Sequence, residues 1–285
     1  MRRKMEEWKR KLKEKLFEVV SKYSTRDRIA IAFSGGVDST TLAMICKNLH
    51  LDIVLLTIGF PDSPDVTHSR NIASKIGLNH YVKELDINRL ENDLKRVYGL
   101  IRSKSPMELE LGLTVLYSCE ACHDVGVDIM MTAQGLDELF CGYERYVQVY
   151  REKGKDAILD EMMNQVDKAL YHKKQHDLIA SALGIRKIDP FLDSDFIRFA
   201  MEVPVEFKMY GPDDELRKRI LRKVALELGV PKEAALKPKK AIQYGSRIHR
   251  EFERIARKRF SKKKAKELGF KGPLEAYVSL YLATE

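Results

Sequence analysis

The chain has few cysteines and no long hydrophobic run, and each shortage excludes a class of protein. Four cysteines among 285 residues cannot form the disulfide framework of a small secreted domain. No apolar run is long enough to span a bilayer, and the basic first residues lack the apolar core and cleavage site of a signal peptide. We therefore expect a cytoplasmic protein with no membrane segment.

Acidic residues are in the minority, and the basic excess is uneven. The 51 Lys and Arg residues oppose 42 Asp and Glu residues, which gives a formal net charge of +9. Residues 1–23 hold nine basic and four acidic residues, and residues 208–264 hold nineteen basic and seven acidic ones. Solvated helix faces are the plain interpretation. Contact with the phosphates of a nucleotide or a nucleic acid is the alternative.

Short apolar runs alternate with helical periodicity through the first half of the chain. This alternation predicts an α/β fold with a doubly wound parallel sheet. After about residue 150 the strand signals become sparse, so a helical C-terminal region is expected. Strands are predicted at 28–33, 52–58, 80–85 and 127–133, and helices at 4–22, 66–77, 88–101 and 107–124.

The first predicted strand leads into the glycine loop Ser34-Gly35-Gly36-Val37-Asp38-Ser39-Thr40. Two glycines let backbone N–H groups approach an anion at the start of the next helix. Asp38 would repel a phosphate unless a divalent cation lay between them, so we interpret it as a Mg²⁺ ligand. Neither G-x-x-x-x-G-K-[ST] nor G-x-G-x-x-G follows this strand, which excludes two other nucleotide loops. A turn in which Asp38 caps the helix is the plain alternative.

Several segments carry a family resemblance. Ser-Gly-Gly-x-Asp-Ser resembles the PP-loop of the ATP pyrophosphatases, which cleave ATP between the α and β phosphates. Four further segments resemble, in the same order, the synthetase domain of asparagine synthetase, and together they extend over about residues 28–250. They are TIGFPDSPDVTHSRNIASKIGLNHYVKEL (57–85), TAQGLDELFCGYERY (132–146), DPFLDSDFIRFAMEVPVEFKM (189–209) and LRKRILRKVALELGVPKEAALKPKKAIQYGS (216–246).

The resemblance implies an enzyme that adenylates a carboxylate with ATP and Mg²⁺, releases pyrophosphate, and passes the acyl group to ammonia or another amine. L-Aspartate is the default substrate. β-Lactam synthetases share the architecture, so the resemblance does not fix the acid. It implies three regions: an N-terminal amphipathic helix (1–26), a PP-loop ATP-binding region (27–150) and a helical region completing the active site (151–285).

The resemblance also assigns roles to individual residues. Asp38 and Asp137 are implied to be the two metal ligands, and Lys239 and Gln134 the catalytic residues. The residues implied to bind the nucleotide are Ala32, Phe33, Ser34, Gly35, Gly36, Asp38, Ser39, Thr40, Ile58, Thr132, Ala133 and Gly135.

The sequence departs from the family pattern in three respects. One is Ile188, which stands where many synthetases have an arginine before Pro-Phe-Leu-Asp. Gln134 stands where the synthetases have a glutamate, and an amide cannot accept the proton that the attacking amine must lose. The PP-loop begins within about 35 residues of the first residue, so no N-terminal glutaminase domain is expected. Glutamine is then not expected to serve this chain alone as a nitrogen donor, and a separate glutaminase subunit is a partner that the resemblance allows.

Two other functions stay open. Cys119 and Cys122 form a Cys-x-x-Cys pair and Cys141 is a distant third cysteine; some PP-loop enzymes that thiolate tRNA use such a set to bind an iron–sulfur cluster. A zinc site with His123 is a further alternative, and packing of small apolar cysteines is the interpretation we favour. The second open function is that of an ATP-binding homologue without synthetase activity, which Gln134 suggests. The oligomeric state is unknown.

Overall fold

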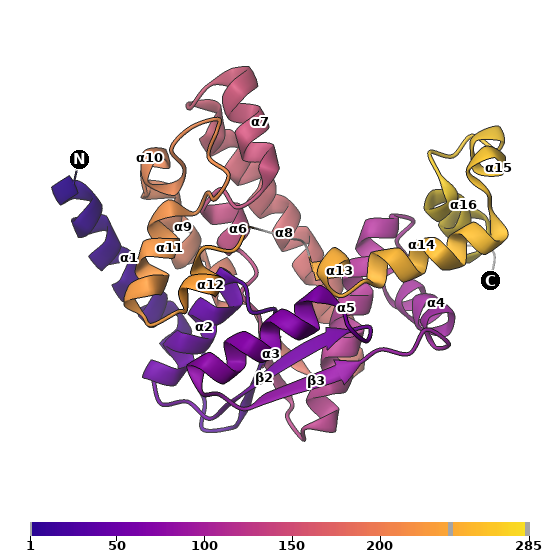
Figure 1. Cartoon of the computed structure of the whole chain (residues 1–285), viewed down its shortest axis with the longest axis horizontal. Coiled ribbons are helices and arrows are strands. Elements are labelled where there is room, and N and C mark those ends of the chain that lie inside the picture. Colours follow the sequence, from indigo (N-terminus) through magenta and orange to yellow (C-terminus); the bar gives the residue numbers. More distant parts are fainter. Residues whose placement is uncertain (1, 239–241, 283–285) are drawn as a thin grey trace.

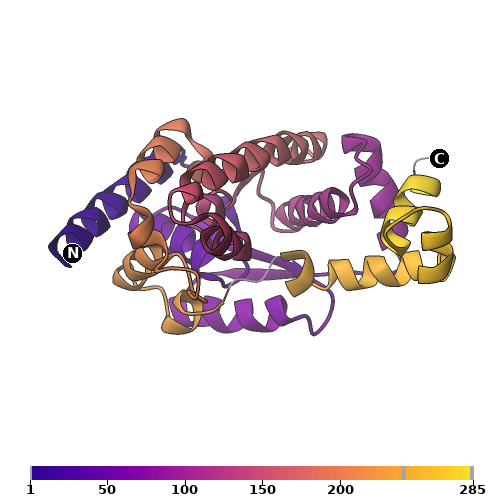
Figure 2. The same cartoon turned by 90° about the horizontal axis from the view of Figure 1, so that it is seen from above.

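The computed structural model describes residues 2–238 and 242–282 and contains one parallel sheet with helices on both faces (Figures 1 and 2). The strand order is β3-β2-β1-β4-β5, and all neighbouring strands are parallel. The order reverses at β1, so its carboxyl end opens onto the crevice where such sheets bind ligands. The strands are β1 (Ile29–Ala32), β2 (Ile53–Gly59), β3 (His80–Glu84), β4 (Ile129–Met131) and β5 (Arg186–Ile188).

The helices of the first half follow the periodicity of the sequence. They are α1 (Arg2–Lys22), α2 (Val37–Asn48), α3 (Pro64–Ile76), α4 (Leu90–Ile101) and α5 (Pro106–Asp124). The second half is mainly helical, as expected. Its helices are α6 (Leu136–Leu139), α7 (Glu144–Lys153), α8 (Ala157–Ala182), η1 (Pro190–Leu192), α9 (Ser194–Glu202), α10 (Val205–Lys208), α11 (Arg219–Glu227), α12 (Lys232–Ala235), α13 (Ile242–Gly245), α14 (Ile248–Arg259), α15 (Lys262–Glu267) and α16 (Pro273–Leu280).

Strand β5 comes from the part of the chain in which no strand was predicted. Its sequence, Arg-Lys-Ile, is too short and too polar to give a strand signal. It forms because Ile188 pairs with Met131 at the edge of the sheet, where the neighbouring strand determines the conformation. The sheet is therefore completed by the second half of the chain, and the three-region division stays a prediction.

The sheet separates two apolar cores. Ile29 and Ile31 face one core, which includes buried residues of α1, α2 and α11, whereas Ala30 faces the other, which includes residues of α4, α5 and α14. Side chains alternate across a strand, so a buried strand covered on both faces reads as a continuous apolar run. This explains why the sequence signal of β1 was strong.

Cys119 and Cys122 lie in the second core with no exposed surface, and Cys141 is equally buried in a third cluster. Burial raises the pKa of each thiol to about 12. The described residues contain no group of three or more side chains placed to share a metal ion. In this structure the three cysteines therefore pack as small apolar side chains. Residues 2–238 and 242–282 also contain no helix long and apolar enough to cross a membrane.

Candidate active site

The glycine loop lies between the carboxyl end of β1 and the first turn of α2. Gly35 has φ +70°, a conformation that disfavours other residues, and a Cβ there would lie 2.9 Å from Cδ2 of His68. The His68 ring packs against the loop and forms a 3.0 Å hydrogen bond between its Nε2 and the Gly35 carbonyl oxygen. Inside the loop, the hydroxyl of Ser39 accepts a hydrogen bond from the Ser34 N–H, 3.3 Å long. These contacts fix the conformation of the loop at the start of α2, where backbone N–H groups can bind an anion.

Asp38 and Asp137 converge on one cation that belongs to the protein. Nζ of Lys218 lies 2.5 Å from Oδ2 of Asp38 and 2.6 Å from Oδ1 of Asp137. The Lys218 side chain is only 1% exposed, and a lysine is seldom buried to this extent without a charged partner. Two carboxylates 99 positions apart in the chain, at 38 and 137, therefore meet at one cation, the ammonium group of Lys218. Their expected role as Mg²⁺ ligands stays a prediction.

The backbone that carries Lys218 has an unusual conformation. Arg217 and Lys218 have φ values of +51° and +50°, in the left-handed region that side chains with a Cβ disfavour. Hydrogen bonds fix this turn: Asp214 accepts from the N–H of Arg217, and the Arg217 guanidinium donates to the Gly142 carbonyl oxygen. Such strain persists where the surroundings impose it, and here it directs Lys218 at the two carboxylates.

Two cavities meet at the glycine loop and share Ser34 and Asp38. The smaller, about 40 Å³, is bordered by three basic side chains. The larger, about 270 Å³, lies between the ends of β1 and β4 and the helices α5 and α8. A charged recess beside a roomier and more apolar one suits the phosphates and the organic part of a nucleotide or acyl substrate. The basic residues of the smaller cavity are Lys218, Arg222 and Lys237.

The end of β4 forms another wall of the larger cavity. The hydroxyl of Thr132 donates a 2.5 Å hydrogen bond to Oδ1 of Asp189, and the Gln134 N–H donates to the Thr132 hydroxyl oxygen. The Gln134 side chain donates to the carbonyl oxygen of Ala169 on α8 at 3.3 Å. The amide nitrogen of Gln134 is therefore engaged with the backbone of α8. Its amide oxygen can only accept a hydrogen bond.

Helix α8 contributes two histidines to the same cavity. His176 is buried, and desolvation lowers its pKa to about 3. Burial also lowers the pKa of His172, whose Nε2 lies 3.9 Å from Oε1 of Glu108. Glu108 in turn accepts a 2.8 Å hydrogen bond from Gln175. Both imidazoles are therefore neutral at pH 7 and retain a nitrogen lone pair.

The structure brings most of the expected residues together. Gly36 lines the smaller cavity, whereas Gly35, Thr40 and Gly135 line neither. A Cβ at Gly35 or Gly135 would clash with neighbouring atoms, and Thr40 is buried in α2. Ile58 is buried in the second core rather than at the cavity surface, so its expected contact with the nucleotide is not seen in these cavities. Lys239 lies outside the described residues. The expected residues that line the larger cavity are Ala32, Phe33, Ser34, Asp38, Ser39, Thr132, Ala133, Gln134 and Asp137.

Sequence reasoning missed Lys218 and Arg222. Both lie in the basic segment LRKRILRK, in a region that already resembled the synthetases, and this concentration of charge was the available signal. Helical spacing could not have paired them, because Lys218 precedes α11 in a left-handed conformation. Arg222 is buried, and desolvation lowers its pKa although its guanidinium donates to the carbonyl oxygens of Ala235 and Lys237.

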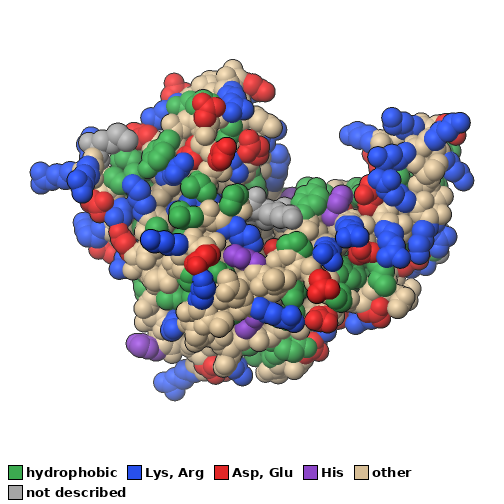
Figure 3. All heavy atoms as spheres, viewed as in Figure 1, with side chains coloured by type: hydrophobic (Ala, Val, Ile, Leu, Met, Phe, Trp, Pro, Cys, Tyr) green, Lys and Arg blue, Asp and Glu red, His purple; other side chains and the backbone are tan. Residues whose placement is uncertain are grey.

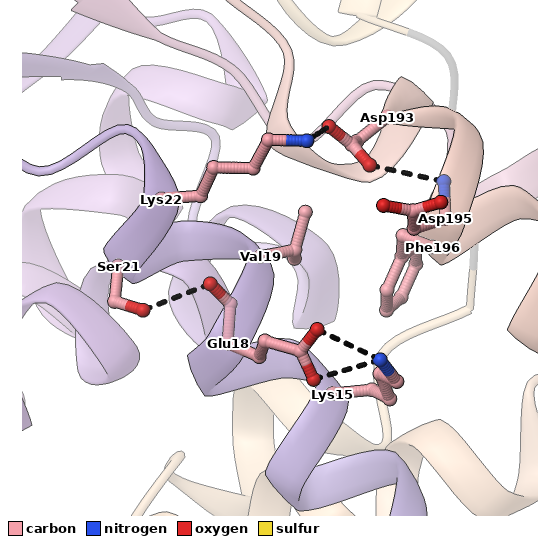
Figure 4. Close-up of a pocket in the computed structure, with 8 residues that line it drawn as sticks. All are labelled: Lys15, Glu18, Val19, Ser21, Lys22, Asp193, Asp195 and Phe196. Atoms are coloured by element: carbon pink, nitrogen blue, oxygen red, sulfur yellow. Dashed lines mark hydrogen bonds and ion pairs between the residues drawn. The ribbon is translucent and has the colours of Figure 1, made fainter.

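A separate hollow of about 330 Å³ lies between α1 and α9 (Figure 4). Its charged groups already have partners within the protein: Lys22 lies 2.5 Å from Oδ2 of Asp193, and Lys15 pairs with Glu18. The other carboxylate oxygen of Asp193 accepts from the N–H of Asp195 and caps α9. This aspartate, part of the Pro-Phe-Leu-Asp segment, therefore has a structural role here.

The donor set fits a magnesium ion. Oδ1 of Asp38 is buried and accepts no hydrogen bond from the residues that the structure describes. Hard carboxylate oxygens are the ligands that Mg²⁺ prefers, and two of them with substrate phosphates are a usual set. Lys218 contacts the other oxygen of Asp38, Oδ2, so Oδ1 is not used by this lysine.

A family model described as Asparagine synthase matches residues 11–183 and 154–274. The chain is 28% identical over 274 residues to the putative glutamine-hydrolyzing asparagine synthetase 1 of Methanocaldococcus jannaschii, a match covering 85% of this chain and 50% of that protein. The glutamine-hydrolyzing asparagine synthetase 3 of Arabidopsis thaliana is 24% identical over 221 residues, covering 72% of this chain and 37% of that one. The chain thus spans about half or less of these curated relatives.

Two solved structures are similar at lower levels. NMN synthetase from Francisella tularensis matches 98% of this chain and 95% of its own with a TM-score of 0.45 and 12% identity. NH3-dependent NAD synthetase from Campylobacter jejuni matches 71% of this chain and 93% of its own with a TM-score of 0.34 and 13% identity.

The family match extends from α1 into α16 and includes both carboxylates, the glycine loop and Lys218. The residues that meet around the two cavities are therefore all within the matched part of the chain. On this evidence the chain belongs to the asparagine synthase family.

Proposed function

We propose that this protein is an ATP-dependent ligase that adenylates a carboxylate, L-aspartate by default, with release of pyrophosphate. The acyl group then passes to ammonia or another amine, supplied free or by a separate glutaminase subunit, and AMP leaves. The observation that carries the proposal is the convergence of Asp38 and Asp137 beside the glycine loop, with Lys218 between them.

In the first step, negative charge is redistributed on the phosphates, so the main task of the protein is positioning and electrostatic stabilisation. The smaller cavity supplies fixed positive charge through Lys218 and Arg222 next to the loop that would hold the leaving pyrophosphate. Because these groups are buried, their field is screened less than that of surface lysines. Asp38 and Asp137 would hold Mg²⁺, which supplies further charge neutralisation when bound.

The second step needs a group that takes a proton from the amine, and Gln134 cannot do so. Among the described residues lining the larger cavity, the carboxylates of Asp38 and Asp137 are engaged with Lys218. Glu138 accepts a 2.7 Å hydrogen bond from the Tyr143 hydroxyl. His176, with a pKa of about 3, is too weak a base.

His172 is the remaining candidate for the general base. It is neutral at pH 7, it lines the cavity, and Glu108 stands beside its ring to stabilise the imidazolium that would form. A carboxylate near the base, itself held by a third group, can stabilise the protonated base through its charge even at 3.9 Å, which is too long for a hydrogen bond. The proton lost by the amine would thus move to His172 as the C–N bond forms and the bond to AMP breaks.

The test is pyrophosphate release from Mg·ATP with and without L-aspartate, in the presence of ammonium, with amino acid products assayed in parallel. Aspartate-dependent pyrophosphate together with asparagine supports the full proposal. Pyrophosphate without an amide would place the defect at amine attack. ATP binding without any pyrophosphate release would favour a nucleotide-binding homologue without synthetase activity.

Asp38→Asn supplies the matching variant. It keeps the shape of the side chain but removes the charge, so Mg·ATP turnover should be lost with the fold intact. Asp52→Asn is the control, because Asp52 is exposed at the opposite, amino-terminal end of β2. Pyrophosphate release by Asp38→Asn equal to that of Asp52→Asn would contradict the assignment of the loop.

A further inference from the structure

The net charge of the chain is concentrated in one segment. Residues 247–271, which we call the basic arm, hold eleven Lys and Arg residues and three Glu residues, a net charge of +8. The other 260 residues hold 40 basic and 39 acidic residues, and so contribute +1 to the formal +9. The arm consists of α14, α15 and the turns beside them, and Lys and Arg side chains gather over it in Figure 3.

Much of this charge has no partner within the protein. Lys258, Lys262, Lys266 and Lys271 are exposed and form no ion pair with any residue that the structure describes. Helix α1 is also basic, but its glutamates pair with its own Lys and Arg residues three or four positions away. A solvated face therefore accounts for α1 better than for the arm.

The arm is a fixed surface. Phe252 and Ala256 of α14 are fully buried, and the Phe252 ring meets that of Tyr277 edge-on at 5.9 Å. The Tyr277 hydroxyl and the Arg259 guanidinium both donate 2.9 Å hydrogen bonds to Glu91 of α4. Like charges repel, so an ordered and unneutralised basic surface is unfavourable unless a polyanion covers it.

The arm begins next to the candidate active site and extends away from it along α14 (Figure 1). It follows α13, whose Ile242 lines the larger cavity. Figures 1 and 3 show α15 turning away from α14, so that the basic surface bends around one side of the broad hollow above the sheet. A bent surface fits a cylindrical polyanion better than a flat one such as a membrane.

The composition of the arm points to phosphate contacts alone. Residues 247–271 contain no Asn or Gln, which pair with adenine edges, and their Lys and Arg residues are typical phosphate contacts. Arg can also read guanine in a major groove, but the major groove of an A-form duplex is too narrow for side chains to enter. Leu268 is the one large apolar side chain among the described residues of the arm that is prominently exposed, at 49%. Membrane insertion and protein interfaces require more apolar or aromatic surface than this.

We propose that the basic arm binds the phosphate backbone of an RNA duplex next to the nucleotide cavities. RNA is favoured over DNA because the A-form major groove is narrow and brings facing phosphates close together, which suits a dense set of point charges that reads no bases. Binding is expected to be independent of sequence and strongly dependent on salt.

The experiment is fluorescence anisotropy with the whole protein and a labelled RNA duplex of about 20 base pairs. Replacing Lys258, Lys262, Lys266 and Lys271 with Gln should reduce the slope of log K against log salt by about 3 to 4. At about 50 mM salt, where wild-type binding is tightest, affinity should fall by about 100-fold. Circular dichroism and pyrophosphate release check that the fold and the proposed activity are unchanged.

The matched control removes four charges from α1 by Arg2→Gln, Arg3→Gln, Lys4→Gln and Lys13→Gln, and should retain RNA affinity within about 3-fold. An equal loss in both variants would overturn the proposal, because net charge rather than the arm would then be responsible. Equal or tighter binding of a DNA duplex of the same sequence would overturn the assignment to RNA. Tighter binding to phosphatidylserine vesicles would replace it with a membrane surface.

Discussion

At the scale of single residues, the site depends on a buried lysine whose charge is held between two carboxylates. Lys218 contacts Asp38 and Asp137 and is almost fully enclosed. Removing one partner of a buried ion pair leaves uncompensated charge, at a cost of about 3 to 5 kcal/mol. In this case the charge left behind would be that of two carboxylates facing each other, which a divalent cation could neutralise.

We therefore expect Lys218→Met to lower the melting temperature in a chelating buffer, and Mg²⁺ to restore part of the loss. Pyrophosphate release should fall even when Mg²⁺ is saturating, since a fixed cation at the phosphates is gone. Differential scanning calorimetry with and without Mg²⁺ makes the measurement. The control is Lys22→Met, which breaks the ion pair between Lys22 and Asp193, whose Nζ and Oδ2 atoms are 2.5 Å apart. This pair lies outside the candidate site. Equal stabilisation of that variant by Mg²⁺ would contradict this account.

The proposed base makes a second residue-scale prediction. His172→Gln should slow amide formation by about 100-fold or more while leaving carboxylate-dependent ATP–pyrophosphate exchange unchanged, because only the second step needs a proton acceptor. At a constant concentration of free ammonia, the wild-type rate should fall as pH decreases through the pKa of His172, which burial places below 6.5, and the variant should lack this fall.

His249→Gln is the matched control, because His249 forms the other histidine–glutamate pair, with Glu110 at 2.8 Å, outside both cavities. Hydroxylamine needs less help from a base than ammonia, so it should restore product formation by His172→Gln. Identical kinetics for the two variants would remove His172 from the mechanism.

At the scale of elements, the short connection between α6 and α7 positions the carboxylate of Asp137. A Cβ on Gly142 would lie 2.0 Å from Oδ1 of Asp137 and 2.3 Å from Cε of Lys218. Gly142→Ala should therefore displace both groups, lower the free energy of unfolding by about 1 to 3 kcal/mol and remove Mg·ATP turnover. Urea unfolding and pyrophosphate release measure the two effects.

Gly99→Ala in α4 provides the comparison, because a Cβ there meets no atom within 4 Å. This variant should gain about 0.5 to 1 kcal/mol of stability from helix propensity, with activity unchanged. A neutral Gly142→Ala would mean that the loop can move aside, and that the site is less rigid than its contacts suggest.

Elements differ in how well the sequence predicts them. Helix α3 ends at Gly77 in the left-handed conformation, as a C-terminal glycine predicts, and the apolar run of β2 is buried throughout. Strand β5 gave no signal because one apolar residue in three shows no alternation. Local preferences determine long periodic elements, whereas a short edge strand depends on the strand beside it.

At the scale of the whole molecule, buried neutral histidine should make the protein sensitive to acid. His176 faces Lys187, Asp189, His172 and Lys173, and desolvation, the largest effect, lowers its pKa from 6.5 to about 3. Between those values the unfolded chain binds a proton that the folded protein does not. The free energy of unfolding should therefore fall, as pH decreases from 6.5 towards 3, by up to about 1.4 kcal/mol per pH unit from this residue.

His176→Asn should reduce the dependence of the free energy of unfolding on pH by up to about 1.4 kcal/mol per pH unit. Urea unfolding at pH 7, 6 and 5 measures this slope. The exposed His50 gives the control: His50→Asn should leave the slope unchanged. Parallel slopes for wild type and His176→Asn would show that His176 is protonated in the folded protein.

The sequence by itself determined the parallel sheet and the glycine loop at its centre, because these follow from local periodicity and a contiguous motif. The pairing of Asp38 with Asp137 was implied by the family resemblance. Only the tertiary structure revealed that Lys218 joins the two acids, that His172, with Glu108 next to it, lines the same cavity as Gln134, and that the basic arm follows α13, whose Ile242 lines this cavity. The physical reason is that these groups come from distant parts of the chain. Their proximity depends on how α8, α11 and α14 pack on the sheet, which no local pattern encodes.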